Sequence, residues 1–165
     1  MIYIAIPLYA LAIIAANLLV LKFGPSITPI NAFFLIGLDL ALRNWLNLRM
    51  RPFAMGGLIF GTGLLTWAVN PAAQNIAIAS AVAFTCAALV DWLAFRAAAG
   101  CTWMQRNVAG SMSGAIVDSL IFPTLAFGAF LPSIVVLQFV AKVAGASMWA
   151  YLMRPSAASV ERPEA

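Results

Sequence analysis

Long apolar stretches follow one another along almost the whole chain, separated by short breaks that contain Gly, Pro or basic residues. A helix that crosses a bilayer needs about 20 mostly apolar residues. Stretches that match or approach this length cover approximately residues 2–22, 30–48, 52–70, 74–98, 104–129 and 132–153. The pattern therefore predicts an all-α integral membrane protein, built as a bundle of about six transmembrane helices.

The breaks between the stretches have the chemistry of helix ends. Gly24 and Pro25 are expected to end the first helix, and the pair Asn70-Pro71 predicts a tight turn. Pro132 is expected to begin the last helix, because a first-turn position has no use for the N–H that proline lacks. We expect one transmembrane domain over residues 1–154, followed by a polar, disordered cytoplasmic tail at 155–165.

Composition supports a membrane protein and argues against several other classes. Of the 165 residues, 64% are hydrophobic and 8% are charged, whereas soluble domains have about 25% charged residues. The chain has no histidine and two cysteines, so we expect no metal site and no cofactor. It also lacks a phosphate-binding Gly-rich loop and a nucleophile motif, so we expect no enzyme activity.

The distribution of basic residues predicts the orientation. With a cytoplasmic N-terminus and six spans, the cytoplasmic helix ends carry seven of the nine Lys and Arg residues, and the outer ends carry only Lys22. An excess of basic residues marks the cytoplasmic side. We therefore expect both termini in the cytoplasm of a bacterial-type inner membrane. The net charge of +4 reflects these anchors, and no nucleic-acid partner is expected.

Asp118 and Lys142 interrupt the fifth and sixth apolar stretches near their midpoints. A charge at mid-membrane costs roughly 2.5–3.5 kcal/mol on insertion scales, and such residues often serve function. Because the two residues lie at matching depth on consecutive helices, we expect their side chains to pair. The pair either fixes helix register alone or forms part of a substrate or proton site.

Asp39 and Arg43 are four residues apart and share one face of the second helix. Either Arg43 extends to the headgroups and Asp39 neutralises it, or both line a transport pathway. Asp91 lies near the predicted cytoplasmic end of the fourth helix, five residues before Arg96. Helix capping or anchoring explains that position.

Other polar and small residues add candidates. Asn17 and Gln138 are uncharged polar residues within apolar helices, and each either joins helices or contacts a ligand. Phe122 is one of several aromatic residues that could stack on a flat ligand. Gly57 with Gly61, and Gly110 with Gly114, form small-residue pairs that allow close helix packing and permit a homodimer.

The ordered set of polar positions resembles the VUT family of membrane proteins, a vitamin-uptake family associated with transport of queuosine precursors. The resemblance rests on AANLLVLKFG, NAFFLIGLDLALR, IASAVAFTCAALVDWLAF, RNVAGSMSGAIVDSLIFPTLAFGAF and LQFVAKVAGASMWAYLM, and it covers about residues 10–153. The chain departs from the family at Ala115, near which a polar residue is common. The positions that match the family pattern are Asn17, Asp39, Arg43, Asp91, Asp118, Ser119, Phe122 and Lys142.

The resemblance implies a small-molecule deazapurine, 7-cyano-7-deazaguanine or 7-aminomethyl-7-deazaguanine, as the transported substrate. Its guanine-like N–H edge suits a carboxylate, and its carbonyl suits a Lys or Asn donor. Asp118, Lys142 and Asn17 supply such a set. Two other functions stay open: a substrate-capture subunit of an ATP-driven vitamin-type importer, and a structural membrane protein that transports nothing.

Overall fold

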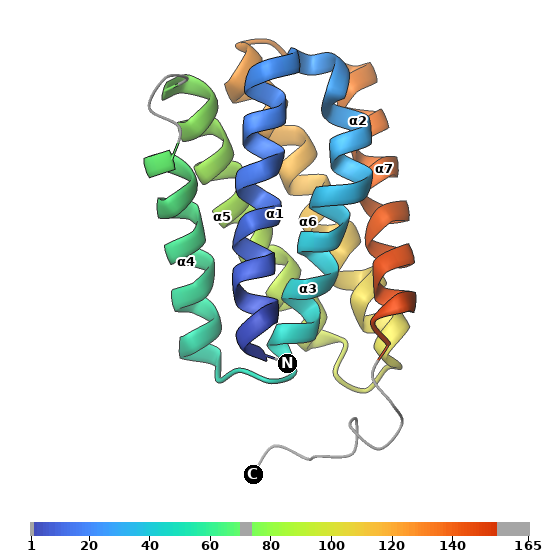
Figure 1. Cartoon of the computed structure of the whole chain (residues 1–165). Helices are drawn as coiled ribbons and strands as arrows, with labels where there is room; N and C mark the ends of the chain where they lie inside the picture. Colours follow the sequence, from blue (N-terminus) through green and yellow to red (C-terminus); the bar gives the residue numbers. More distant parts are fainter. Residues whose placement is uncertain (1, 70–73, 155–165) are drawn as a thin grey trace.

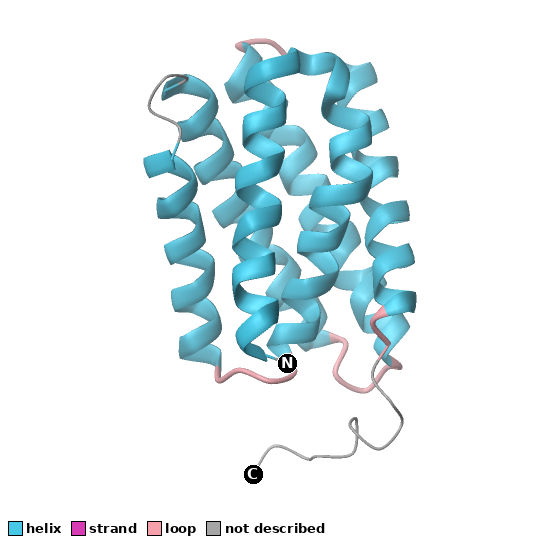
Figure 2. Ribbon diagram, viewed as in Figure 1, coloured by secondary structure: helices cyan, strands magenta, loops and turns pink. Residues whose placement is uncertain are grey.

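The computed structural model describes residues 2–69 and 74–154, and within these ranges every regular element is helical. Figure 2 shows no strand in the described part of the chain, which confirms the all-helical prediction. The elements are α1 (Ile2–Phe23), a 3-10 turn η1 (Gly24–Ile27), α2 (Thr28–Asn31), a π-helical segment η2 (Ala32–Ile36), α3 (Gly37–Asn47), α4 (Pro52–Val69), α5 (Gln74–Ala97), α6 (Trp103–Phe127) and α7 (Pro132–Leu152).

The helices stand side by side in one bundle (Figure 1). The helix α1 and the returning segment of α2, η2 and α3 are neighbours, with α5 and α6 behind them. At the flanks, α4 packs mainly on α5, and α7 packs on α6, α3 and η2. One cluster of buried side chains joins α1, α3, α4 and α5 around Tyr9, Leu46, Met55 and Phe84.

Four helical segments of the described residues are long and apolar enough to cross a membrane: Tyr3–Asn47, Ile78–Ala97, Trp103–Phe127 and Pro132–Leu152. The first is 45 residues long and reverses direction at Gly24, whose φ of 68° suits a residue without a side chain. The described residues thus contain four candidate membrane spans, and the number of about six passes stays a prediction.

Most predicted helix boundaries agree with the structure to within about two residues. Helix α1 ends at Phe23 and α7 begins at Pro132, as expected from Gly24 and Pro132. Residues 24–29 differ from the prediction, because they continue as short helical turns and not as a loop. The predicted turn at residues 70–71 and the predicted tail lie outside the described residues.

The connections rich in basic residues lie at one end of the bundle. The start of α1, the α3–α4 connection, the α5–α6 connection and the end of α7 all lie at this end (Figure 1). This arrangement agrees with the distribution of Arg residues along the sequence. Which side of a membrane this end faces stays a prediction.

Helix α7 approaches the returning segment unusually closely at Gly145. A Cβ atom built on Gly145 would collide with the carbonyl group of Phe33, and one built on Gly37 would meet the Gly145 backbone at 2.7 Å. The contact is thus backbone against backbone, which only two glycines allow. It brings α7 and its Lys142 against the helix that carries Asp39.

We expect Gly145→Val to destabilise the protein by at least about 1–3 kcal/mol, because the backbone of η2 cannot move aside as a flexible side chain can. Thermal unfolding of the detergent-solubilised protein measures the effect. Gly57→Ala is the matched control, because a Cβ at Gly57 meets nothing within 4 Å and alanine favours a helix. Equal unfolding temperatures for the two variants would contradict the close contact.

The two predicted glycine pairs have different outcomes. Gly110 and Gly114 on α6 lie against α5, where added Cβ atoms would meet atoms of Asp91 at 2.4 and 2.9 Å, so the close approach predicted there is confirmed. Gly57 and Gly61 on α4 face open space, and tight packing within the bundle is wrong for that pair. Helix α4 is at the flank, so these glycines meet no other helix among the described residues. The homodimer stays a prediction.

Candidate functional site

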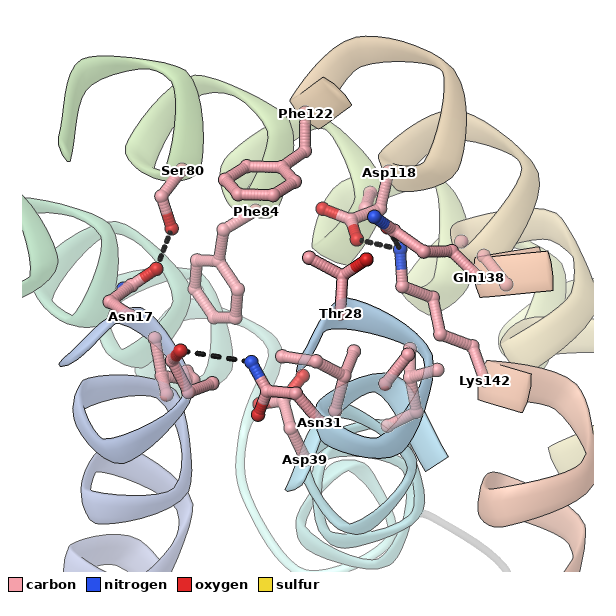
Figure 3. Close-up of a pocket in the computed structure, with 18 of the residues that line it drawn as sticks. Asn17, Thr28, Asn31, Asp39, Ser80, Phe84, Asp118, Phe122, Gln138 and Lys142 are labelled. Atoms are coloured by element: carbon pink, nitrogen blue, oxygen red, sulfur yellow. Dashed lines mark hydrogen bonds and ion pairs between the residues drawn. The ribbon is translucent and has the colours of Figure 1, made fainter. Parts of the chain in front are cut away.

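A cavity lies between α1, the returning segment, α5, α6 and α7 (Figure 3). Its volume is about 50 Å³, on a measure by which one buried water needs roughly 10–15 Å³. The cavity therefore has room for several waters. The polar and aromatic residues of its wall are Asn17, Thr28, Asn31, Asp39, Arg43, Ser80, Phe84, Asp118, Phe122, Gln138 and Lys142.

Lys142 and Asp118 form the ion pair that their depths predict. The Lys142 ammonium lies 2.5 Å from Asp118 Oδ2 and also donates to Gln138 Oε1 at 2.9 Å and Ser119 Oγ at 3.1 Å. The ammonium has three N–H donors, so these three acceptors satisfy it. Lys142 is buried, while the Asp118 side chain keeps 19% exposure. The pair therefore presents its acidic side to the cavity.

Four residues of the cavity wall carry buried polar atoms that have no hydrogen-bond partner: Asn17 Nδ2, Asn31 Oδ1, Asp39 Oδ1 and Gln138 Nε2. Two of these atoms are donors and two are acceptors. Leaving a buried polar atom unpaired costs about 1–3 kcal/mol. Their concentration around one cavity is typical of a site that is completed by a solute or by water.

The other polar atom of the Asn17 amide and of the Asn31 amide is hydrogen-bonded to a neighbouring helix. Asn31 Nδ2 donates to the backbone carbonyl of Ala16 on α1 at 2.9 Å, and Ser80 Oγ on α5 donates to Asn17 Oδ1 at 2.7 Å. Each bond spans two elements and directs the other end of the amide. The unpaired ends of Asn17 and Asn31 are therefore positioned before any ligand binds (Figure 3).

Two phenylalanines form an apolar part of the wall. Phe84 on α5 and Phe122 on α6 are both buried and line the cavity, and Figure 3 shows both rings beside it. Phe122 also packs edge-on against Phe127, with the ring centroids 6.1 Å apart. Aromatic faces beside polar groups suit a flat heterocycle, which can stack on the rings while its edge is hydrogen-bonded.

A second polar cluster adjoins the cavity and is centred on Arg43. Its guanidinium pairs with Asp39 Oδ2 at 2.5 Å and with Asp91 Oδ2 at 3.1 Å, and it donates to the Tyr9 hydroxyl at 3.2 Å. All four side chains are 2% exposed or less. The pairing of Arg43 with Asp39 on one helix face is confirmed. The interpretation that Arg43 extends to the headgroups is wrong, because its partners lie in the bundle interior.

Asp91 does not have the anchoring role that the sequence suggested. Its side chain is fully buried among the helices, although it lies near the end of α5 as expected. Its Oδ1 accepts from Asn44 Nδ2 at 3.2 Å, and the Asn44 amide reaches Asn107 of α6 at 3.2 Å. The close packing at Gly110 allows this, because α6 has no side chain there to block the carboxylate.

The residues predicted from the sequence to bind the substrate are Asn17, Asp39, Arg43, Asp118, Ser119, Phe122, Gln138 and Lys142. The structure brings seven of these eight together in the cavity wall. The eighth, Ser119, is buried beside the wall, where its hydroxyl accepts from Lys142. Their roles in binding a substrate stay predictions.

Sequence reasoning missed Thr28, Asn31, Ser80 and Phe84, which also line the cavity. Asn31 and Ser80 are single polar residues in apolar surroundings, the same signal that identified Asn17. Thr28 and Phe84 carry no such signal. The Thr28 hydroxyl donates to the carbonyl of Pro25 at 2.7 Å, an ordinary bond within a helical turn.

The comparison with protein families gives a match over nearly the whole chain. Residues 3–154 match the model of a family described as "Putative vitamin uptake transporter". Neither the curated proteins nor the solved structures contain a match to the chain. The match covers all the helices that form the cavity and the Arg43 cluster, and it confirms the resemblance that the polar positions indicated. The chain therefore belongs to the putative vitamin uptake transporter family.

Proposed function

We propose that the chain imports a queuosine precursor, 7-cyano-7-deazaguanine or 7-aminomethyl-7-deazaguanine, through the cavity between its helices. The observation that carries the proposal is the set of four unpaired polar atoms around one cavity inside an apolar bundle. Membership of an uptake family supports transport. The same membership argues against an enzyme.

The cavity wall offers chemistry that suits a guanine-like solute. The Asp118 carboxylate and Asn31 Oδ1 are acceptors for the N–H groups of the base edge, and Gln138 Nε2 and Asn17 Nδ2 are donors for its carbonyl. Phe84 and Phe122 supply aromatic surface beside them, on which the flat ring could stack.

The helix arrangement supports a topology for the proposed transporter. We place about six passes in a bacterial-type inner membrane, with both termini in the cytoplasm. The reversal of the 45-residue segment at Gly24 supports two passes within that segment, and the basic connections at one end of the bundle support the orientation. Labelling single cysteines placed in the α3–α4 connection from either side of the membrane tests this.

Complementation tests the transported substrate. Cells that cannot make the precursor and have no other uptake route receive it at low concentration, and queuosine in their tRNA is measured. We expect expression of the chain to restore queuosine. Failure to do so with the protein present in the membrane would overturn the proposed substrate.

The purified chain in liposomes separates the proposed function from the substrate-capture alternative. Exchange of labelled precursor against unlabelled precursor inside the vesicles, with no other protein present, is expected of a transporter. Binding without exchange would indicate a capture subunit that needs an ATPase partner. If the chain neither binds the precursor nor exchanges it, a structural role is favoured.

A further inference from the structure

The charged groups inside the described bundle do not balance. Three carboxylates, Asp39, Asp91 and Asp118, lie in the interior with only two cations, Arg43 and Lys142. Three negative charges against two positive charges leave one in excess. Arg96 and Arg106 lie at the end of the bundle, partly exposed and with interactions of their own. An uncompensated charge in a membrane interior is costly, so it takes up a proton or a cation.

The excess carboxylate belongs to the Arg43 cluster. Lys142 has Asp118 as its counter-ion, and this pair is balanced. Arg43 instead holds two carboxylates with one positive charge. Asp39 and Arg43 line the same cavity as Asp118 and Lys142, so a charge added at Asp39 is close to the proposed substrate.

Of the two carboxylates in that cluster, Asp39 is the one able to take a proton from the cavity. Both oxygens of Asp91 accept hydrogen bonds, from Arg43 and Asn44. Asp39 uses Oδ2 for Arg43, while its Oδ1 is buried without a partner and its side chain lines the cavity. A proton on Oδ1 would neutralise Asp39, and its Oδ2 could still accept the hydrogen bond from Arg43.

We propose that Asp39 is the coupling-proton site of the transporter, and that one proton enters with each neutral solute molecule. Asp39 takes the proton from the outer solution as the solute binds and releases it to the cytoplasm as the solute leaves. No bond of the solute changes. This inference rests on the proposed function, because it assigns the driving force of the same cavity.

The charged and titratable groups around Asp39 come from each helix that faces it. They are Arg43 on its own helix, Tyr9 on α1, Asp91 on α5, Asp118 on α6 and Lys142 on α7. The described part of α4 and the turns before Asp39 carry no such group. The proton therefore removes the excess negative charge, and uptake of a neutral solute should rise as the outer pH falls.

Purified protein in liposomes tests the proposal, with the membrane potential held at zero by potassium and valinomycin and with labelled 7-cyano-7-deazaguanine as the neutral probe. Acidifying the outer solution by one pH unit should drive about tenfold accumulation of the probe, because one pH unit is a tenfold ratio of proton concentration and one proton enters with each solute. Asp39→Glu should still accumulate the probe in response to the pH gradient. Asp39→Asn should show no gradient-driven accumulation, even if it still exchanges the probe.

The outcomes separate the two proposals. If the wild-type protein exchanges the precursor but does not accumulate it in response to the pH gradient, proton coupling is overturned and transport stands. Accumulation that follows a sodium gradient would have the same meaning. Absence of exchange would overturn the proposed function and this inference with it. Accumulation by Asp39→Asn equal to wild type would overturn the assignment to Asp39.

A second measurement decides the matter if Asp39→Asn does not fold. 7-Cyano-7-deazaguanine is added to the solubilised wild-type protein in weak buffer with a pH indicator. About one proton should leave the solution for each molecule of 7-cyano-7-deazaguanine that binds. Asp39→Glu should do the same. No proton uptake on binding would overturn the proposal.

Discussion

Asp118→Asn is expected to reduce uptake of the deazapurine precursor to background while the protein remains folded. The amide keeps the size of the carboxylate but loses its charge, and it can no longer accept the N–H edge of the base with both oxygens. Gln138 and Ser119 still accept from Lys142, so the ammonium keeps two of its partners. Uptake in the complemented strain, with protein amount in the membrane as a check, measures the effect.

The double variant Asp118→Leu, Lys142→Leu distinguishes a binding role from a purely structural one. Replacing both members of a buried ion pair by apolar residues is often neutral or stabilising by about 1–4 kcal/mol. We therefore expect normal or raised thermal stability together with no uptake. Retained uptake in this variant, or in Asp118→Asn, would show that the pair serves only to hold helices together.

Arg43→Met should have the largest effect on stability, a loss of about 3–5 kcal/mol, because it leaves Asp39 and Asp91 buried without a cation. The same change removes the hydrogen bond from Arg43 to the Tyr9 hydroxyl, so α1, α3 and α5 lose the interactions that Arg43 makes between them. Thermal unfolding in detergent, or the amount of folded protein recovered from membranes, measures the loss.

Arg49→Met is the matched control for that change. Arg49 lies in the exposed turn after α3, where it stacks 3.6 Å from the Trp45 ring centroid and donates to the Trp45 carbonyl. Surface substitutions of this kind usually change stability by about 0.5 kcal/mol or less. If both methionine variants were equally stable, the ion pairs of Arg43 would contribute nothing to the fold.

Most of the helical architecture could be predicted because each spanning segment is apolar over its whole length. Gly24 and Pro132 marked helix ends correctly for local reasons, since their backbone preferences act within one turn. The structure adds a capping box between Thr102 and Gln105, whose hydrogen bonds start α6 one residue before the predicted position. The short helical turns after Gly24 were missed because Pro25 and Pro29 also suit a loop.

The partner of each buried charge could be predicted only within one helix or between helices adjacent in the sequence. Asp39 with Arg43, and Asp118 with Lys142, follow from spacing and depth. The bond from Arg43 to Asp91 joins residues 48 positions apart, and no local signal indicates it. The glycine at 110 that makes room for Asp91 was identified, but only as a packing position.

The sequence by itself determined that the chain is a helical membrane protein of an uptake family, because hydrophobic length and the order of polar positions are properties of the chain in one dimension. The tertiary structure decided which polar groups share a cavity and which charges share a counter-ion. These depend on how the helices are rotated and how closely they approach, which Gly37, Gly110 and Gly145 control through backbone contacts. The excess carboxylate at Asp39 became visible only once the three acids and two bases were placed together.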